Sequence, residues 1–286
     1  MTLIIIYTIL SAIGAALTYI LTGLYQNLAF LVWFPLVCFF VYWLIFAIGT
    51  WIWIMITSRF MSKKKPQVKP SMFAQLTLTE IADVLIFFFG VHVKMSKEDR
   101  KFIKDVKKNK TPIVVVANHT SNLDQFFLWS MFRNSPIVAL SKPEIQNVPI
   151  IGRYSYAAGN ISINRDNPMQ ALRGISQSVT FLKNNPTTSF SMFPEGTRSK
   201  NGVMGEFHNA PFIVPTKADR PLVLMSIQNA HAIKNRMFRK ITRVYIDIVK
   251  VIPVEEIKKM SAQELCDTSR ELIFNYYESH KDRLYK

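Results

Sequence analysis

A histidine and an aspartate five positions apart, in the segment NHTSNLD at 118–124, are the residues best suited to catalysis. An unperturbed imidazole titrates near pH 6.5, so His119 can serve as a general base at neutral pH. If His119 precedes a helix and Asp124 lies in its first turn, the carboxylate can reach the imidazole, fix its tautomer and stabilise the imidazolium. An alternative stays open, in which Thr120 or Ser121 is an N-cap and Asp124 only a first-turn acid favoured by the helix dipole.

The sequence offers no protein nucleophile for His119 to activate. A serine elbow of the G-x-S-x-G type is absent, although enzymes that form an acyl-serine intermediate on an α/β-hydrolase sheet carry one. If His119 is a base, it therefore acts on a hydroxyl of the substrate. This predicts direct transfer to an alcohol without a covalent enzyme intermediate.

A second polar cluster, FPEGTRS at 193–199, follows another apolar segment. Arg198 lies beside a glycine that leaves backbone amides accessible, which suits a phosphate or a carboxylate. Arg165 ends a further expected strand, and two arginines at adjacent strand ends would favour an anionic ligand. Taken singly, each arginine is more often an exposed surface residue, and Glu195-Gly196 is a common turn.

Alternating elements from about residue 98 must position these clusters. Apolar, β-branched runs predict strands at 111–118, 136–142, 160–165, 188–196, 221–228 and 242–252. Helices are expected at 98–110, at 122–132, after the cap Asn167-Pro168, and from the capping box Ser261–Glu264 to about 280. The pattern predicts an α/β fold with a mostly parallel central sheet flanked by helices. Ligands of such sheets bind beyond the carboxyl ends of the strands, where both clusters fall.

The helix expected after Asn167-Pro168 has a pattern of apolar residues that predicts which face is buried. After Asn167-Pro168, apolar residues recur at helical spacing. They are Leu172, Ile175, Val179 and Leu182.

The N-terminal part of the chain differs in composition from the rest, because its first charged residue is Arg59. Apolar runs at 3–24 and 29–56 are each long enough for a bilayer core, which needs roughly 20 residues. A signal peptide would have a basic start and a shorter apolar core, so we expect a retained, membrane-embedded helical hairpin at 1–58. Whether it crosses the bilayer or enters one leaflet is left open. Basic residues just after it, at 59–69, predict that the catalytic part faces the cytoplasm.

Residues 59–97 are expected to form a basic linker and an apolar segment, followed by a catalytic domain at 98–286. The apolar segment, 72–93, contains Glu80 and Asp83, which disfavours a membrane span. A helix that lies on the membrane or covers the globular domain fits better. Its sequence does not separate these two possibilities.

The formal net charge of +16 lies entirely in the chain after the apolar runs. Such a charge suits nucleic acid, an anionic membrane or acidic small molecules. The apolar N-terminal runs favour membrane lipids, and no nucleic-acid reading motif is present. Cys38 and Cys266 have no spacing that indicates a metal site or a disulfide framework.

These motifs resemble those of the glycerolipid acyltransferases of the 1-acylglycerol-3-phosphate O-acyltransferase type. NHTSNLD matches the N-H-x-x-x-x-D motif of that family, and GNISINR at 159–165 is similar to its G-x-I-x-I-x-R motif. FPEGTRS matches the third motif, and SKPEIQNVPIIG at 141–152 resembles the linker between motifs. Order and spacing agree over roughly residues 111–230.

The resemblance implies that His119 deprotonates a glycerol hydroxyl of a lysophospholipid, whose oxygen attacks the thioester of acyl-CoA or acyl-carrier protein. Asp124 would orient His119, and no metal or bound cofactor would be needed. The implied residues that bind the acceptor's phosphate and shape its pocket are Arg165, Glu195, Gly196 and Arg198, with Asn118 and Thr197 as further members.

Lysophosphatidic acid is the acceptor that the resemblance favours, with phosphatidic acid as product. Glycerol 3-phosphate or another lysophospholipid stays open as acceptor, as does a membrane-tethered basic binding module without catalysis. The sequence departs from the family at 207–210, where FHNA stands for F-K-x-G, and at Leu224, where a second proline is expected. These departures bear on the acceptor and leave the His119–Asp124 chemistry unchanged.

Overall fold

The structure is a computed structural model that describes residues 2–23, 33–61, 63, 68–164, 167–198 and 203–285. The chain divides into two compact units, Met1–Met61 and Ser62–Lys286. The segment expected at 59–97 therefore falls partly in each unit.

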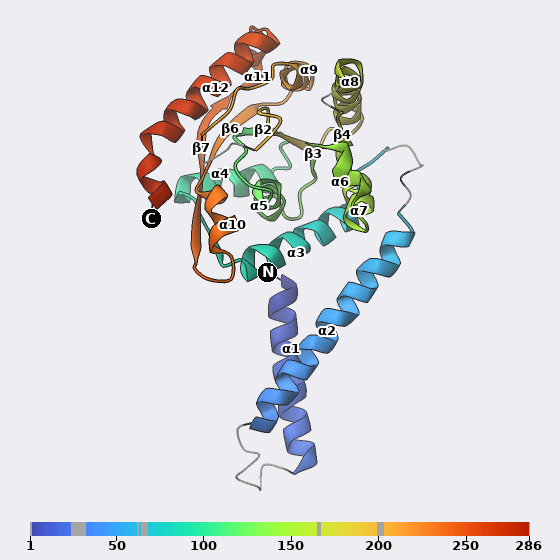
Figure 1. Ribbon diagram of the computed structural model, residues 1–286. Helices are drawn as coiled ribbons and strands as arrows, with labels where there is room; N and C mark the ends of the chain where they lie inside the picture. The colour runs from blue at the N-terminus through green and yellow to red at the C-terminus, as the bar shows by residue number, and fades with distance from the viewer. Residues whose placement is uncertain are drawn as a thin grey trace. The chain divides into compact units, whose positions relative to one another are not determined.

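The first unit is a pair of apolar helices, α1 (Thr2–Thr22) and α2 (Trp33–Arg59), that pack on each other (Figure 1). Polar groups meet in their interface: the Thr18 hydroxyl lies 2.8 Å from the Tyr42 hydroxyl, and Tyr7 pairs with Thr50. Gly14 lets the Tyr42 ring approach closely, since an added Cβ would lie 3.1 Å from it. Among the described residues, these two helices have the length and composition to cross a membrane.

The second unit is built on one sheet. Within the described residues, seven strands join in the order β1-β7-β6-β2-β5-β3-β4, and only the β6–β7 pair is antiparallel. The strands are β1 (Val91–Lys94), β2 (Val114–Ala117), β3 (Ile137–Ser141), β4 (Ile161–Ser162), β5 (Ser189–Met192), β6 (Leu222–Gln228) and β7 (Thr242–Ile252). The mostly parallel α/β fold predicted from the sequence is confirmed.

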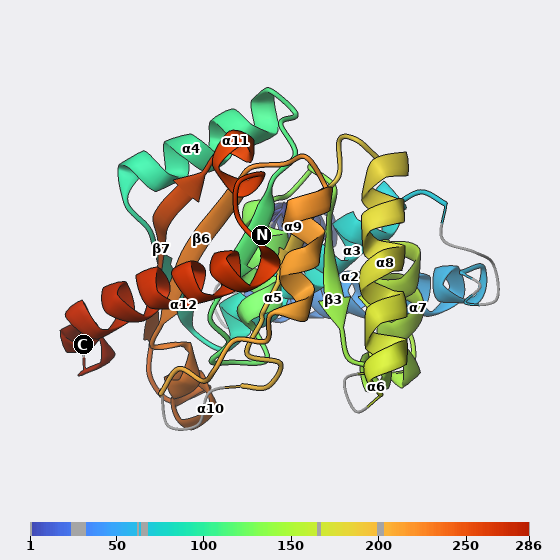
Figure 2. The same cartoon turned by 90° about the horizontal axis from the view of Figure 1, so that it is seen from above.

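Helices cover both faces of this sheet. The longer ones are α3 (Met72–Phe88), α4 (Lys97–Lys108), α5 (Asp124–Met131), α7 (Ile151–Ala157), α8 (Pro168–Asn184) and α12 (Ala262–Ser279). The shorter ones are α6 (Pro143–Asn147), α9 (Ile213–Lys217), α10 (Ile233–Arg236) and α11 (Val254–Ile257), with 3-10 turns η3 (Ala210–Phe212), η4 (Ala230–Ala232) and η5 (Lys281–Tyr285). Figure 2 shows α8, α9 and α12 in front of the sheet and α3 and α5 behind it.

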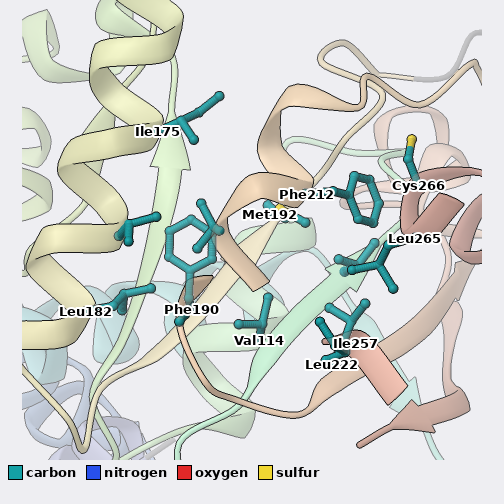
Figure 3. Packing of buried hydrophobic residues seen from close by; sticks show 14 of the residues in the cluster. Val114, Ile175, Leu182, Phe190, Met192, Phe212, Leu222, Ile257, Leu265 and Cys266 are labelled. Atoms are coloured by element: carbon teal, nitrogen blue, oxygen red, sulfur yellow. The ribbon is translucent and has the colours of Figure 1, made fainter. Parts of the chain in front are cut away.

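A large cluster of the hydrophobic core lies between the sheet and the helices of the α8–α12 face (Figure 3). Ile175 and Leu182 of α8 point toward Phe190 of β5, while Leu265 of α12 packs near Phe212. The predicted caps hold these helices in place. Asn167 accepts the backbone N–H of Gln170 at the start of α8, and Ser261 with Glu264 forms the complete capping box of α12.

Helix α3 covers the globular unit, which answers the question that the sequence left open. Gln75 is buried and donates to the carbonyls of Ile137 and Ala158 at 3.2 and 2.9 Å. The two acids in this apolar helix, Glu80 and Asp83, both pair with Arg133 beyond the end of α5. Their charges are thus compensated by the domain that α3 covers.

Three sequence expectations differ from the structure. The strand β1 was not predicted, because its four residues VHVK follow directly on an apolar helix. The strand expected at 160–165 is only two residues long. Leu172, expected on the core face of α8, is 51% exposed, since the buried residues of that helix begin at Gly174.

Two leucines on α8 give a matched test of this core. Leu182→Ala should lower the free energy of unfolding by about 2–5 kcal/mol, because Leu182 is completely buried and its loss leaves a cavity. Leu172→Ala, on the exposed part of the same helix, should change it by less than about 0.5 kcal/mol. Denaturant unfolding of the purified protein in detergent measures both values. Equal losses would contradict the packing of α8 described above.

Candidate active site

The end of strand β2 fixes the start of the site. Asn118, completely buried, donates its side-chain amide to the Ile227 carbonyl at 2.9 Å and accepts the Ile227 N–H at 2.7 Å. This pair of bonds ties the end of β2 to the end of β6. Because β2 lies in the middle of the sheet, the next residue, His119, emerges at the carboxyl edge on a well-supported backbone.

Asp124, the first residue of α5, holds the imidazole of His119. Its Oδ2 lies 2.9 Å from His119 Nδ1 and also accepts the N–H groups of Thr120 and Ser121 at 2.6 and 2.8 Å. The carboxylate is completely buried. Asp124 is thus an acid in the first turn of α5 that also contacts the histidine. The expected N-cap at Thr120 or Ser121 is wrong, because the N-cap position of α5 is Leu123, which makes no side-chain cap bond.

The same contacts determine the tautomer of His119. A carboxylate oxygen can only accept, so Nδ1 must carry the proton in its bond to Asp124. The neutral ring then has its lone pair on Nε2. A protonated ring would be stabilised by the buried carboxylate beside it. Nε2 of the neutral ring is then the nitrogen that can accept a proton.

Glu195 supports the same histidine from the end of β5. One carboxylate oxygen accepts the His119 N–H at 2.6 Å, and the other accepts the Gly205 N–H at 2.8 Å. Burial raises the pKa of this carboxyl above its ordinary value, while the two N–H donors act in the opposite direction. Glu195 therefore joins the His119 loop to the loop at 203–209, and both of its oxygens are occupied by backbone.

Phe193 completes the setting of the imidazole. Its ring stacks on that of His119 with 4.6 Å between centroids and 23° between planes. The His119 side chain keeps 23% exposure. The ring is thus held on one face by an aromatic ring and at Nδ1 by Asp124, yet it stays accessible to a substrate.

The other predicted site residues lie in the turn after β5 or outside the described residues. Gly196 has a φ of +71°, as the turn after β5 requires, while Thr197 and Arg198 are exposed. Arg165 lies outside the described residues. The expectation of adjacent strand ends is wrong, because β3 lies between β4 and β5. Strand order depends on tertiary packing, and the sequence gives no sign of it.

Sequence reasoning missed three residues near the site. Phe193 lies inside the third motif, but no role was assigned to its ring. Gly205 lies ten positions after Glu195 in the sequence and contacts it. A Cβ at position 205 would lie only 3.2 Å from a carboxylate oxygen of Glu195, so the absence of a side chain permits this close approach. Tyr277 of α12 is buried, and its pKa is raised to about 12, first by burial and then by charges that include Glu195 and Asp124.

Comparison with known proteins agrees with this geometry. The acyltransferase family matches residues 97–228, from α4 to the end of β6. This range holds His119, Asp124, Glu195 and the strands that carry them. Residues 97–228 are thus similar to the acyltransferase family. The resemblance inferred from the motifs is thereby confirmed at the level of the family.

Individual relatives are similar over the same part. A chloroplastic 1-acyl-sn-glycerol-3-phosphate acyltransferase of Brassica napus is 29% identical over 62% of this chain and 50% of its own length. The enzyme of that name from Chlamydomonas reinhardtii is 31% identical over 57% of this chain and 47% of its own length. The chain spans about half the length of the curated relatives that it matches first.

A solved structure extends the likeness in fold to almost the whole chain. The crystal structure of the 1-acyl-sn-glycerophosphate acyltransferase PlsC of Thermotoga maritima aligns with a TM-score of 0.58 over 96% of this chain and 97% of its own. Sequence identity is 18%. The fold, with its two N-terminal apolar helices and its α/β sheet, is therefore a PlsC-like fold.

The substitution Glu195→Gln tests the bridge between the two loops. A glutamine has one acceptor oxygen, so one of the two N–H donors would face an NH₂ group. We expect a loss of about 1–3 kcal/mol in the free energy of unfolding. Glu206→Gln, on the same loop but with an exposed carboxylate paired to Arg270, should cost less than about 1 kcal/mol.

The pH dependence of this loss follows from the raised pKa. The folded protein binds the Glu195 proton more readily than the unfolded chain, so the wild type loses stability as the pH rises past about 4.3, the ordinary value for glutamate. Glutamine does not titrate. The stability gap between wild type and Glu195→Gln should therefore be widest at acidic pH and narrow as the pH rises. A stability difference between the two proteins that widens as the pH rises would contradict the raised pKa of Glu195.

Proposed function

We propose that the protein is a membrane-bound acyltransferase that moves a fatty acyl group from a thioester to the free hydroxyl of lysophosphatidic acid, giving phosphatidic acid. The observation that carries the proposal is the buried Asp124 carboxylate bonded to His119 Nδ1, which leaves Nε2 as an accessible base. The relatives named above act on 1-acyl-sn-glycerol 3-phosphate by their names. That acceptor presents one hydroxyl and one phosphate.

The reaction needs a base and no protein nucleophile. His119 Nε2 takes the proton of the acceptor hydroxyl, whose oxygen forms a bond to the thioester carbonyl carbon. The carbon–sulfur bond then breaks, and the thiol leaves with the proton that His119 returns. Asp124 stabilises the imidazolium between these two events. The products are the new ester and the free thiol of coenzyme A or of acyl-carrier protein.

The anionic end of the acceptor requires cationic or N–H groups near His119. Arg198 is exposed three residues after Glu195 and carries its charge next to the Gly196 turn. Arg165, Gly196 and Thr197 remain proposed members of the phosphate site. Glu195 has a different part in this proposal, because both of its oxygens bind backbone and a carboxylate would repel the phosphate.

The proposed location is the membrane, with the acyltransferase domain on the cytoplasmic side. Helices α1 and α2 would hold the chain in the bilayer, where its acceptor also resides. The basic residues at 59–69 support the orientation, since positive segments beside a membrane helix stay cytoplasmic.

Three substitutions at the pair test the base. His119→Ala and Asp124→Ala should each lower kcat by roughly 10²–10⁴-fold, the usual contribution of general base catalysis. The kcat of Asp124→Asn should lie between the kcat of these two variants and that of the wild type. An amide oxygen at the Oδ2 position keeps the tautomer of His119 but carries no charge. Asp105→Asn, an exposed carboxylate on α4, is the matched control. Full activity of His119→Ala would contradict the proposal that His119 is the general base.

A substrate panel tests the acceptor separately. Membranes containing the protein would be supplied with lysophosphatidic acid, glycerol 3-phosphate or lysophosphatidylcholine, each with acyl-CoA and with acyl-carrier protein. We expect the highest kcat/KM with lysophosphatidic acid, and its loss in His119→Ala. A preference for glycerol 3-phosphate would reassign the acceptor, and no transfer with either donor would favour the non-catalytic binding module.

A further inference from the structure

Large apolar side chains are exposed around the end of helix α3. Phe87 and Phe88 end helix α3, and Phe238 and Ile241 lie in the connection from β6 to β7. Their exposed fractions are 52%, 46%, 74% and 60%. These four residues, together with the basic residues named below, are called the edge patch. Aromatic rings that are exposed to this degree are unusual on a surface that faces only water.

The two segments of the edge patch form one surface. The ring of Phe89 packs edge-on against that of Phe238 at 5.4 Å, and the Thr242 N–H donates to the Gly90 carbonyl at 2.9 Å. Phe238 adopts a φ of +63°, in the left-handed region that bulky residues avoid. The backbone therefore adopts a disfavoured conformation at the residue whose ring is presented outward.

Basic residues surround these rings. Lys234, Arg236, Arg239, Lys240 and Arg243 fall within ten positions, and the sequence has no acidic residue between Asp219 and Asp247. In the part of the chain that the structure describes, none of these five forms an ion pair. A hollow of about 690 Å³ beside them is lined by Lys234, Asn235, Met237, Phe238 and Arg239. The patch thus combines apolar rings with uncompensated positive charge.

The sheet places the edge patch on the same edge as His119. Strand β6 runs parallel to β2 and ends at Gln228, so the connection that follows lies at the carboxyl edge. Strand β7 returns antiparallel, and β1 runs parallel to β7, so the end of α3 reaches this edge as well. Figure 1 shows the end of α3 beside the α10 connection. Further along the edge, Ile145 and Val148 after β3 and Met169 after β4 are also exposed.

We propose that the edge patch docks on the surface of an anionic lipid bilayer, with Phe87, Phe88, Phe238 and Ile241 at the boundary between headgroups and acyl chains. Aromatic rings favour that boundary, and lysine and arginine beside it attract anionic lipid. Docking there turns the carboxyl edge, and with it His119, toward the membrane surface. The contact is independent of the reaction, since it needs neither the acceptor nor the base.

The test is a depth measurement on the full-length protein in vesicles. With Cys38 and Cys266 replaced by serine and alanine, Phe238→Cys is labelled with an environment-sensitive fluorophore. In phosphatidylcholine vesicles containing phosphatidylglycerol, we expect a blue-shifted emission that nitroxide-labelled lipids quench. Asp219→Cys carries the control label, because residue 219 precedes β6 at the opposite edge of the sheet, and it should be neither shifted nor quenched.

Charge reversal distinguishes the bilayer from other occupants. The triple variant Arg236→Glu, Arg239→Glu, Lys240→Glu should weaken docking roughly a hundredfold, since each basic residue near an anionic surface contributes about a factor of five. Its unfolding midpoint should stay unchanged, because none of the three side chains is buried. A blue-shifted emission that nitroxide-labelled lipids do not quench would mean that protein covers the ring. Equal quenching at 219 and 238, or none at 238, would also overturn the proposal.

Discussion

The buried hydrogen bonds to one carboxylate oxygen are the constraint on which the site depends. Asp124 Oδ2 accepts from His119 Nδ1 and from the N–H groups of Thr120 and Ser121, all within 2.9 Å. The backbone bonds fix the position of the oxygen, and the oxygen fixes the ring and its tautomer. A charge buried in this way needs such donors, because an unpaired carboxylate away from water is very costly. The requirement of folding and the requirement of base chemistry are met by the same atom.

The surrounding sheet makes this arrangement rigid. Asn118 joins β2 to β6, and Glu195 joins the end of β5 to the loops on either side of it. Buried polar groups that are hydrogen-bonded in networks specify one geometry more strongly than apolar packing does. His119 thus lies where the central strands end, held by three different segments of the chain. The accessible side of the ring is left for the substrate.

Much of this could be predicted from the sequence, where the signal is local. Unbroken β-branched runs predicted the buried strands, and Asn167 and Ser261 predicted two helix starts, because capping is decided within four residues. The His119–Asp124 pair was predictable for the same reason. The contact of Gly205 with Glu195 was not, since nothing in the linear order relates them. Strand order was likewise hidden, which is why Arg165 and Arg198 were wrongly expected at adjacent strand ends.

The state of the His119 ring is the most direct measure of the central claim. Nitrogen-15 NMR of protein labelled at histidine distinguishes the two neutral tautomers, and the signal of His119 is identified by its loss in His119→Ala. We expect the neutral ring to be protonated at Nδ1, with Nε2 unprotonated. A ring protonated at Nε2 would place the lone pair against Asp124 and would contradict the assignment of His119 as the base.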